Sequence, residues 1–422
     1  MNSTADQLAH RLASELGDDS VTADPAKLAS RKVEGKIPAL LCIPASEEQL
    51  SVALRLCSET RAAVVPWGGG TAMALGNAPR HLDVVLSTER LDRVIDHDHA
   101  NLTVTVESGV ILACLQHQLA DHHQFTPLEP PFPDRASIGG TIAANLNGPR
   151  RSCYGSVRDL VIGIKVVLMR GEKIKAGGKV VKNVAGYDMC KLFVGSLGTL
   201  GIISEATLRL APAPEVSATL VLSGTFAHAR QFVHEVNHSR LLPSAVILRI
   251  DGLRQQLAVR YEGFAENVAR CQHDLTALAA KISLSMETLG ANEHGAFWRL
   301  IEDFPLQSDG VVLRVSLPRA EVFSFAETIS RWQSTTIVAD TLMGTLWVSL
   351  APSATALERF FELASMARDR RSHAIIFSAP TELKRGVEVW GESPPTISLM
   401  RGLKQQFDPR ELLNPGRFLG GL

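Results

Sequence analysis

Residues 177–203 read GGKVVKNVAGYDMCKLFVGSLGTLGII, and this glycine-rich stretch decides the prediction of the fold. It contains two motifs, KNVAGYD at 182–188 and GSLGTLGII at 195–203. Ser196 is not the nucleophile of a serine hydrolase, because Val194 stands where the Gly-x-Ser-x-Gly elbow requires its first glycine. We therefore do not predict a serine hydrolase, and the motifs need another explanation.

Three further motifs precede this stretch. Residues 66–71 (PWGGGT) follow an apolar strand expected at 62–66, residues 137–145 read SIGGTIAAN, and residues 154–159 read YGSVRD. Successive glycines form a nest of backbone N–H groups that suits a diphosphate, and small residues at a turn into a helix let a flat or anionic ligand lie against the backbone. The first motif is neither a Rossmann fingerprint nor a Walker loop. Taken alone, it is more typical of a structural glycine turn.

The order and spacing of the motifs are more specific than any one of them. All five occur in sequence between residues 66 and 203, and over residues 33–213 they resemble the FAD-binding domain of the vanillyl-alcohol oxidase / p-cresol methylhydroxylase (PCMH) superfamily. The resemblance implies an α+β protein. A PCMH-type FAD-binding domain of two α+β subdomains would be followed by an α+β C-terminal domain with a ferredoxin-like, antiparallel sheet.

The resemblance also implies how FAD would be held. The first glycine loop would hold the pyrophosphate, the Ser-Ile-Gly-Gly turn and residues 154–156 would lie on the diphosphate and flavin side, and the Gly-Thr-Leu-Gly-Ile-Ile run would lie along the nucleotide. The residues that it implies for FAD binding are Pro66, Trp67, Gly68, Gly69, Gly70, Thr71, Ala72, Ser137, Ile138, Gly139, Gly140, Ala143, Tyr154, Gly155, Ser156, Gly201, Ile203 and Asn414.

Within the superfamily, the stretch 177–203 and the C-terminal LKQQFDPRELLNPGRF at 403–418 are similar to the FAD-binding subunits of glycolate oxidases, also called glycolate dehydrogenases. The resemblance implies oxidation of glycolate or a similar 2-hydroxy acid with electron transfer through flavin. It implies two partners, a second flavin subunit and an iron–sulfur subunit. Two alternatives remain: a non-catalytic FAD-binding scaffold, and a stand-alone FAD-dependent 2-hydroxy-acid dehydrogenase.

The chain departs from the family pattern at several positions. Thr71, Ala72 and Met73 follow the first glycine loop, where some members have a histidine that carries covalent FAD, so we expect non-covalent FAD. Leu197 stands where self-sufficient hydroxy-acid dehydrogenases have a glutamate. Their His-rich, Gly-Asp-Gly-containing motif is absent from residues 214–422, and His373 has no other histidine beside it in the sequence. We therefore assign no catalytic residue and no metal site from the sequence.

Composition agrees with a globular protein that does not bind nucleic acid. The 422 residues are 45% hydrophobic and 21% charged, with a net charge of −1, so no basic surface is indicated for a polyanion. The sequence contains no apolar run long enough to span a membrane. Its six cysteines form no Cys-x-x-Cys pair, which argues against an iron–sulfur cluster in this chain. We expect a cytoplasmic protein that reaches the inner membrane only through partner subunits.

We predict four segments: a helical N-terminal arm (1–32), the FAD-binding domain (33–213), an α+β cap on the substrate side (214–399) and a tail that returns to the FAD domain (400–422). The boundary near 213 rests on the Ala-Pro-Ala-Pro linker at 211–214. Alternating strand and helix patterns beyond it predict an antiparallel sheet with helices on one face, with a weak sign of duplication. The strands are expected at 216–223, 244–250, 255–262, 311–317, 335–350 and 373–378, and the helices at 226–239, 265–282, 320–332 and 353–370.

The pattern in the first half predicts further elements. A capping box at 46–49 begins a helix that ends near residue 60, the alternation at 102–106 indicates a half-buried strand, and a helix is expected at 110–122. The run DHDH at 96–99 is interpreted as a solvated turn rather than a metal site.

Single charged residues have two interpretations each. Arg314 lies on an alternating strand, where it could bind a substrate carboxylate, although an exposed arginine is the more common case. Lys404 and Arg417 near the tail fit contact with the flavin or a solvated surface equally well.

Overall fold

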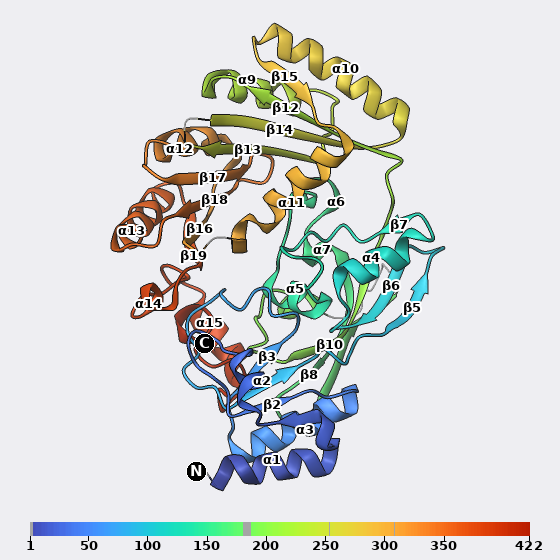
Figure 1. Ribbon diagram of the computed structural model, residues 1–422, viewed down its shortest axis with the longest axis vertical. Coiled ribbons are helices and arrows are strands. Elements are labelled where there is room, and N and C mark those ends of the chain that lie inside the picture. Colours follow the sequence, from blue (N-terminus) through green and yellow to red (C-terminus); the bar gives the residue numbers. More distant parts are fainter. Residues whose placement is uncertain (1–2, 180–186, 253, 308) are drawn as a thin grey trace.

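The computed structural model of the chain describes residues 3–179, 187–252, 254–307 and 309–422. The strands of these residues form three large sheets and one two-stranded pair. Figure 1 shows the first two sheets at the N-terminal end of an elongated molecule, the third sheet at the other end, and the C-terminal tail back beside the first sheet. This is the α+β arrangement that the sequence predicts.

The first sheet has four strands in the order β1–β2–β4–β3, and its last three strands run parallel. Helix α3 follows β2. It begins after Ser46 because the Ser46 Oγ caps its first turn by accepting a hydrogen bond from the Gln49 N–H (3.1 Å). The Gln49 side chain in turn accepts from the Ala45 N–H, one residue before the position that a capping box uses. The elements are β1 (Val21–Thr22), β2 (Leu40–Cys42), β3 (Val64–Trp67), β4 (Val84–Ser87), α1 (Ser3–Leu16), α2 (Pro25–Ala29) and α3 (Glu47–Thr60).

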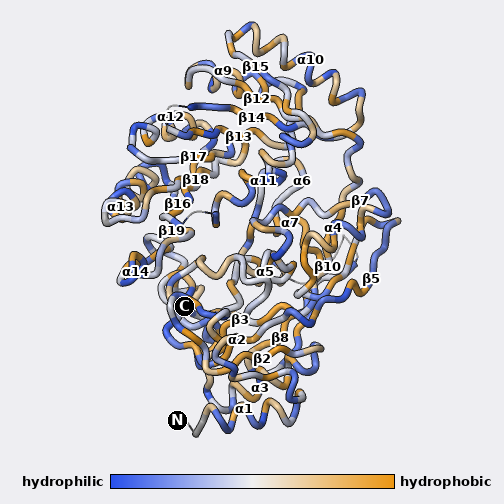
Figure 2. Tube along the Cα trace, viewed as in Figure 1, coloured by the Kyte–Doolittle hydropathy of each residue, from blue (hydrophilic) through white to orange (hydrophobic). Residues whose placement is uncertain are grey.

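The second sheet has five antiparallel strands in the order β5–β6–β10–β8–β9. Valine and isoleucine side chains from β6, β8 and β10 form a buried core with α4 and α5, and Figure 2 shows mostly hydrophobic residues along β8 and β10. The elements are β5 (Val94–Asp98), β6 (Thr103–Glu107), β8 (Val161–Val167), β9 (Lys173–Gly177), β10 (Ile202–Arg209), α4 (Leu112–Ala120), α5 (Ile138–Ala144), α6 (Arg151–Tyr154), α7 (Val157–Leu160), α8 (Cys190–Phe193) and the pair β7 (Gln124–Phe125) and β11 (Ala211–Pro212).

The third sheet has eight antiparallel strands in the order β15–β12–β14–β13–β17–β18–β16–β19. It consists of two β-α-β-β-α-β units that join edge to edge through β13 and β17, so the weak duplication in the sequence is a structural repeat. The first unit is β12 (Val216–Ser223), α9 (Phe226–Asn237), β13 (Ala245–Asp251), β14 (Arg254–Gly263), α10 (Ala265–Lys281) and β15 (Ser285–Thr288). The second is β16 (Val311–Ser316), α12 (Val322–Ile329), β17 (Thr335–Asp340), β18 (Thr345–Leu350), α13 (Ala354–Arg368) and β19 (His373–Ser378).

The two faces of the third sheet have different partners. One face packs in a large core with α9, α10, α12 and α13, as the sequence predicts. The other face packs against α11 (Ala291–Gln307), where Trp298, Ile301 and Phe304 contact side chains of β13 and β17. Helix α11 lies between the third sheet and the N-terminal half (Figure 1). Because α11 covers only part of this face, the rest of the face can line a cavity.

Three predictions of local structure need correction, and two elements were not predicted. The N-terminal arm is not wholly helical, because β1 pairs with β2. Residues 94–98 form the edge strand β5, so the DHDH run begins in a strand and not in a turn. All five residues of β6 are buried rather than half of them, because β5 and β10 flank the strand and α5 packs against it. Strand β15 and helix α11 were not predicted.

The C-terminal residues return to the first sheet. After α14 (Thr381–Lys384) and α15 (Ile397–Phe407), the Val64 N–H donates to the Leu412 carbonyl oxygen (2.8 Å) and the Asn414 N–H donates to the Val64 carbonyl oxygen (2.7 Å). The tail therefore lies beside β3, the strand that leads into the first glycine loop. No helix within the described residues has the length and the apolar composition that crossing a bilayer requires.

Candidate functional site

Three of the five motifs, at residues 66–71, 137–145 and 195–203, come together in one groove although they lie far apart in the sequence. The loop after β3, the start of α5, the run before β10 and the C-terminal tail form its walls. Most of the residues predicted to bind FAD line it: Pro66, Trp67, Gly68, Gly69, Gly70, Thr71, Ala72, Ser137, Gly139, Gly140, Ala143, Gly201, Ile203 and Asn414.

Close packing explains why glycine occupies the first loop. A Cβ atom at Gly69 would lie 1.7 Å from the Arg135 carbonyl oxygen, and one at Gly68 would lie 2.1 Å from the Ser137 Oγ. The Ser137 Oγ also accepts hydrogen bonds from the Gly69 and Gly140 N–H groups (3.2 Å each). The two turns are thus in direct contact, and only glycine fits at positions 68 and 69 without a clash between them.

Two side chains of the tail have unused polar atoms in this groove. Arg417 is 2% exposed and its Nη2 donates to the carbonyl oxygens of Met73 (2.9 Å) and Leu75 (2.5 Å). Its Nε and Nη1, and the Oδ1 of Asn414, are buried without a hydrogen-bond partner in the described chain. Burial lowers the pKa of Arg417 to about 10. Buried polar atoms are normally paired, so these atoms fit a bound polar ligand such as FAD.

Lys404 and Arg417 both belong to the C-terminal segment 403–418, but their side chains have different surroundings. Both are 2% exposed, so neither has the solvated position that the sequence left open. The Lys404 Nζ donates to Asp408 (2.7 Å) and to the carbonyl oxygens of Thr199 and Leu413 (2.8 and 2.9 Å). Arg417 lines the groove, whereas Lys404 holds the tail in place.

Some predicted residues lie elsewhere. Ile138 is fully buried in the core of the second sheet, and Tyr154, Gly155 and Ser156 lie at α6 and the start of α7, outside the groove lining. In the KNVAGYD motif, residues 182–186 lie outside the described residues, and Tyr187 is 96% exposed.

The groove also includes residues that the motifs did not single out for cofactor binding. Leu197 and Gly198 lie inside the GSLGTLGII run, so the motif itself could have indicated them. Thr88 and Ser108 directly follow β4 and β6 and carry no motif. The full additional set is Met73, Thr88, Ser108, Ala144, Leu197, Gly198, Ile202 and Arg417.

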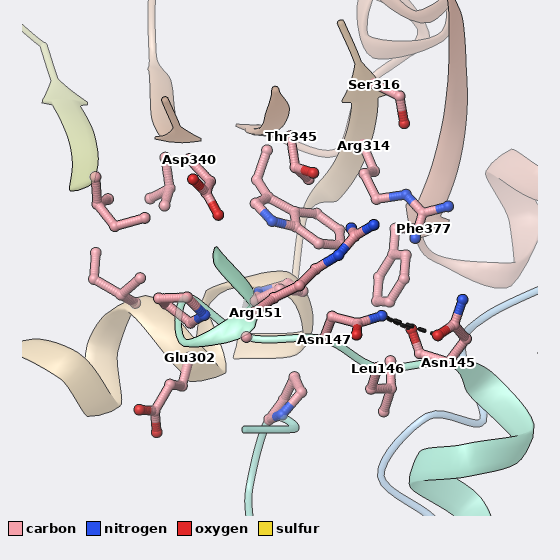
Figure 3. Close-up of a pocket in the computed structure, with 18 of the residues that line it drawn as sticks. Asn145, Leu146, Asn147, Arg151, Glu302, Arg314, Ser316, Asp340, Thr345 and Phe377 are labelled. Carbon is pink, nitrogen blue, oxygen red and sulfur yellow. Dashed lines mark hydrogen bonds between the residues drawn. The ribbon is translucent and has the colours of Figure 1, made fainter. Parts of the chain in front are cut away.

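A second cavity lies next to the groove. Ala143 and Ala144 line the groove, while the following residues 145–149 line the cavity. Its other walls are the free face of the third sheet and α11, which contribute Trp347, Phe377 and Pro305. Figure 3 shows these walls meeting around charged side chains. The cavity is therefore enclosed by both halves of the molecule.

Two guanidinium groups enter this cavity without a carboxylate partner. Arg314 from β16 and Arg151 from α6 both line it, and neither forms an ion pair with another described residue. The Arg314 Nε is buried with no hydrogen-bond partner among the described residues. Burial and the charge of Arg151 lower the pKa of Arg314 to about 10. Arg314 is thus not the exposed strand arginine that the sequence favours, and its position suits an anionic ligand.

Two carboxyl groups in the cavity have unusual proton affinity. Burial raises the pKa of Asp340 to about 7 against the effect of two backbone N–H donors. Burial and the charge of Glu129 raise the pKa of Glu302 to about 8. His373 also lines the cavity, and burial and the charge of Arg314 lower its pKa. Perturbed groups that converge on one cavity are typical of a functional site.

An ionic cluster beside the cavity joins the two halves. Arg150 forms two hydrogen bonds with Glu262 of β14 (2.6 and 3.1 Å) and an ion pair with Glu129 (3.1 Å). Arg260, also of β14, pairs with Glu129 (3.0 Å) and stacks on Trp298 (4.1 Å). Burial opposes the charge of Glu262, but the hydrogen bond from Arg150 and the charge of Arg260 outweigh it and lower its pKa to about 2.

The histidines of the DHDH run lie beside a third histidine. The His97 and His99 rings contact the His122 ring (5.1 and 4.9 Å between centroids). Among the residues that the structure describes, no group of three or more His, Cys, Asp or Glu side chains could hold a metal ion.

Comparison with known protein families finds two matches. Residues 38–177 match the FAD binding domain, and residues 390–418 match the C-terminal domain of FAD linked oxidases. The first match contains the first glycine loop and α5, and the second contains Asn414 and Arg417 of the groove. The two matches thus meet at the groove.

Curated relatives extend over most of the chain. Glycolate oxidase subunit GlcD of Bacillus subtilis is 30% identical over 90% of this chain and 89% of its own length. Glycolate oxidase subunit GlcE of Escherichia coli is 31% identical over 78% of this chain and 85% of its own. D-2-hydroxyglutarate dehydrogenase of Xanthomonas citri is 28% identical over 90% of this chain and 89% of its own.

Solved structures share the fold. The chain matches p-cresol methylhydroxylase with a TM-score of 0.77 at 16% identity, covering 99% of this chain and 97% of that one. It matches alkyldihydroxyacetonephosphate synthase with a TM-score of 0.75 at 16% identity, covering 98% and 86%.

The fold and the groove define an FAD-dependent oxidoreductase, and FAD is its cofactor. Within that class the chain belongs to the family of FAD-linked oxidases with a PCMH-type FAD-binding domain, whose members include glycolate oxidase subunits and D-2-hydroxyglutarate and D-lactate dehydrogenases. The relatives include both GlcD and GlcE of glycolate oxidase, so the similarity does not assign the chain to one of these two types.

Proposed function

We propose that this chain oxidises a small 2-hydroxy acid, with glycolate to glyoxylate as the favoured reaction, as the FAD-binding subunit of a glycolate oxidase complex. The observation that carries the proposal is the cavity beside the FAD groove. It contains two guanidinium groups, Arg314 and Arg151, that have no carboxylate partner among the described residues. A guanidinium group binds a carboxylate through two parallel hydrogen bonds. The relatives named for 2-hydroxy acids support the same substrate class.

Different residues of the groove would bind different parts of FAD. The bare backbone of Gly68, Gly69 and Gly70 would hold the diphosphate, and the N-terminal turn of α5 would pack beside it. Arg417 and Asn414 would pair their free polar atoms with the cofactor. Thr71 and Ala72 leave the loop without a histidine, which supports non-covalent binding. FAD, when bound, supplies a two-electron acceptor beside the cavity.

The chain's own residues would orient the substrate. Arg314 would bind the carboxylate, and Arg151 would add positive charge on the same side of the cavity. Phe377, Trp347 and Leu146 form apolar walls that limit water around the reacting carbon. This arrangement favours a small acid with one hydroxyl group on the carbon next to the carboxylate.

The proposal includes partner subunits. The six cysteines contain no Cys-x-x-Cys pair, so electrons would pass to an iron–sulfur subunit, with a second flavin subunit in the same complex. We place the complex in the cytoplasm, with any contact with the inner membrane through partners. We also propose the division into an arm (1–32), an FAD domain (33–213), a cap (214–399) and a tail (400–422).

The test compares the purified, FAD-loaded chain with its Arg314→Gln variant. We expect a flavin spectrum in both, bleaching by glycolate in the wild type, and a KM about 100-fold higher in the variant, because a charged pair with the carboxylate is lost. Arg249→Gln, on β13 of the same sheet but outside the cavity lining, is the matched control. A colourless wild-type protein would favour a scaffold instead, and equal KM values would exclude Arg314 as the carboxylate site.

The role in a complex needs a separate experiment. Native purification with flavin and iron measured for each component should recover this chain with a second flavin protein and an iron-containing protein. Recovery of the chain alone, with full glycolate oxidation, would exclude the part of the proposal that concerns a complex.

A further inference from the structure

The cavity contains a group that can take a proton from the substrate hydroxyl. This inference rests on the proposed function, which requires such a proton acceptor but does not name it. The His-rich motif that supports oxidation in self-sufficient relatives is absent from residues 214–422. Three titratable groups of the cavity are candidates: Asp340, Glu302 and His373.

Asp340 is fixed with one oxygen atom already satisfied. It ends β17, and its Oδ1 accepts hydrogen bonds from the backbone N–H groups of Leu342 and Met343 (3.0 Å each). These two bonds hold the carboxylate in one orientation, because the turn from β17 to β18 fixes both donors. The residue is 9% exposed, and in Figure 3 its carboxylate points into the cavity. The Oδ2 is therefore the atom that can meet a ligand.

The other two candidates are placed less well. Glu302 lies on α11, and in Figure 3 its carboxylate points away from Asp340 and from the two arginines. His373 begins β19, and burial together with the neighbouring charge of Arg314 lowers its pKa and so disfavours its protonated form. A histidine that resists protonation is a poor proton acceptor.

Arg314 and Arg151 set the direction in which a substrate lies. Figure 3 shows both guanidinium groups beside Phe377, with Asp340 on the other side of the same cavity. A 2-hydroxy acid bound by its carboxylate to Arg314 would present its hydroxyl group toward the remaining polar wall. Asp340 is the polar group of that wall with a fixed carboxylate.

We propose that Asp340 is the catalytic residue that accepts the hydroxyl proton of the 2-hydroxy acid in this chain. The O–H bond breaks and the proton moves to the Asp340 Oδ2. The C=O bond of the 2-oxo acid forms as the α C–H bond breaks, and FAD, when bound, would supply the two-electron acceptor for the departing hydride. The substrate is thereby oxidised by two electrons, and the neutral Asp340 loses its proton to solvent before the next turnover.

The surroundings of Asp340 set its proton affinity near neutral pH. Burial raises its pKa to about 7, while the two backbone N–H donors and the charge of Arg151 act in the opposite direction. A base with a pKa near the working pH combines sufficient ionised form with sufficient affinity for a proton. The charged and titratable groups on the elements packed around Asp340 are Arg151, Arg314, His373, Glu302 and Glu129.

The experiment measures flavin reduction by glycolate, D-lactate and D-2-hydroxyglutarate in the FAD-loaded full chain between pH 5 and 9. We expect the wild-type rate to rise with pH to a plateau above about 7. Asp340→Asn should lower the rate by about 10²–10⁴-fold and remove this rise, because a general base contributes that factor. Asp251→Asn, on the exposed end of β13, is the matched control and should keep the wild-type profile.

A second readout does not depend on turnover. Oxalate, an unreactive dianion, should bind the wild-type holoenzyme with proton uptake at pH 7, because its charge raises the pKa of the nearby carboxyl group. Calorimetry in two buffers of different ionisation enthalpy counts these protons. Asp340→Asn should bind oxalate without proton uptake. Retention of FAD and oxalate by the variant shows that it is folded.

The outcomes separate this inference from the proposed function. If the wild-type chain retains no FAD, or if none of the three acids reduces its flavin, both the proposed function and the role of Asp340 are contradicted. A wild-type chain that is reduced, with Asp340→Asn at the same rate and pH profile, contradicts the role of Asp340 alone. Loss of the pH-dependent step in Glu302→Gln instead of Asp340→Asn assigns the proton acceptor to Glu302 and overturns the proposal.

Discussion

The Asp340 carboxyl group occupies a place that is unfavourable for its charge, and this has a measurable effect on stability. Its pKa rises from an ordinary value of 3.8 to about 7 in the folded chain because it is buried. The folded state therefore binds the proton more tightly than the unfolded state does. The stability that comes from neutral Asp340 is present below pH 4 and is lost as the pH rises to about 7.

Asp340→Asn should remove this pH dependence. The amide keeps an oxygen acceptor for the Leu342 and Met343 N–H groups but cannot ionise. We expect equal free energies of unfolding for variant and wild type near pH 4, and a more stable variant at pH 8, by on the order of 3–4 kcal/mol. Urea unfolding at both pH values measures the difference. A difference that stays constant with pH would show that folding does not raise the pKa of Asp340.

Gly69 tests the contact between the two turns of the groove. A Cβ atom at this position would overlap the Arg135 carbonyl oxygen, a backbone atom that cannot rotate away. Gly69→Ala should therefore separate the turns, lower the FAD content several-fold and destabilise the chain by roughly 2 kcal/mol. Flavin absorbance per protein and thermal unfolding measure both effects.

Gly402 provides the matched control for Gly69. It lies in α15 with no atom within 4 Å of an added Cβ. Gly402→Ala should keep the FAD content and stabilise the helix by about 0.5–1 kcal/mol, because alanine favours the helical backbone. Equal FAD loss in both variants would contradict the clash at Gly69.

The sequence predicts residues of the groove better than residues of the cavity. Glycines at 68–70 and 139–140 form short motifs whose order is visible in the chain. Arg314 and Asp340 are single polar residues on strands, and only the packing of the third sheet against α11 and residues 145–151 turns them toward one cavity. A single sequence contains no local signal for that packing.

At the scale of elements, hydrophobic periodicity explains which predictions were accurate. Strands β12 and β19 begin and end at the predicted residues, because bounded runs of β-branched and apolar residues mark them. Helix α11 was missed, since Gly295 and Pro305 interrupt its pattern. Strand β5 was interpreted as a turn because an edge strand with one solvated side can contain charged residues.

Helix α15 and the tail after it depend on one buried ion pair. The Lys404 ammonium group and the Asp408 carboxylate are 2% and 1% exposed in their side chains, and Lys404 also binds two carbonyl oxygens. Lys404→Met would leave the Asp408 carboxylate buried without its partner, at a cost of about 3–5 kcal/mol. We expect weaker binding of FAD, because Asn414 and Arg417 follow in the same tail.

The exposed Arg401 of α15 provides the comparison. Arg401→Met should change the free energy of unfolding and the FAD affinity little. Chemical unfolding and flavin titration distinguish the two variants. A normal FAD affinity in a destabilised Lys404→Met would show that the tail holds the fold but not the cofactor.

At the scale of the whole molecule, the cavity depends on how the two halves are joined. The walls come from residues 131–151 on one side and from β13, β16 to β19 and α11 on the other. The ionic cluster of Arg150, Arg260, Glu129 and Glu262 crosses the same boundary. The two pairs that cross it, Arg150–Glu262 and Arg260–Glu129, are not visible in the sequence, because their members lie 112 and 131 residues apart in the chain. The family resemblance predicts the two halves but not this connection.

Arg150→Met should loosen the connection between the halves. Arg150 contacts Glu129 of the N-terminal half and Glu262 of the cap, and the Glu262 side chain is fully buried. Without Arg150, Arg260 would be the one arginine paired with the Glu129 and Glu262 carboxylates in this cluster, and the Glu302 carboxyl group also interacts with Glu129. We expect a loss of roughly 3 kcal/mol in the free energy of unfolding and faster limited proteolysis near residues 211–214. Chemical unfolding and a proteolysis time course measure these two effects.

The same change should affect the substrate more than the cofactor, because the cluster borders the cavity whereas the groove lies within the N-terminal half and the tail. We expect a higher KM for the hydroxy acid and an unchanged FAD content. Arg368→Met, which removes an exposed ion pair with Glu392, is the control and should change stability by less than about 1 kcal/mol. A parallel loss of FAD in Arg150→Met would mean that the halves fold as one unit, and that the cavity cannot be altered independently of the groove.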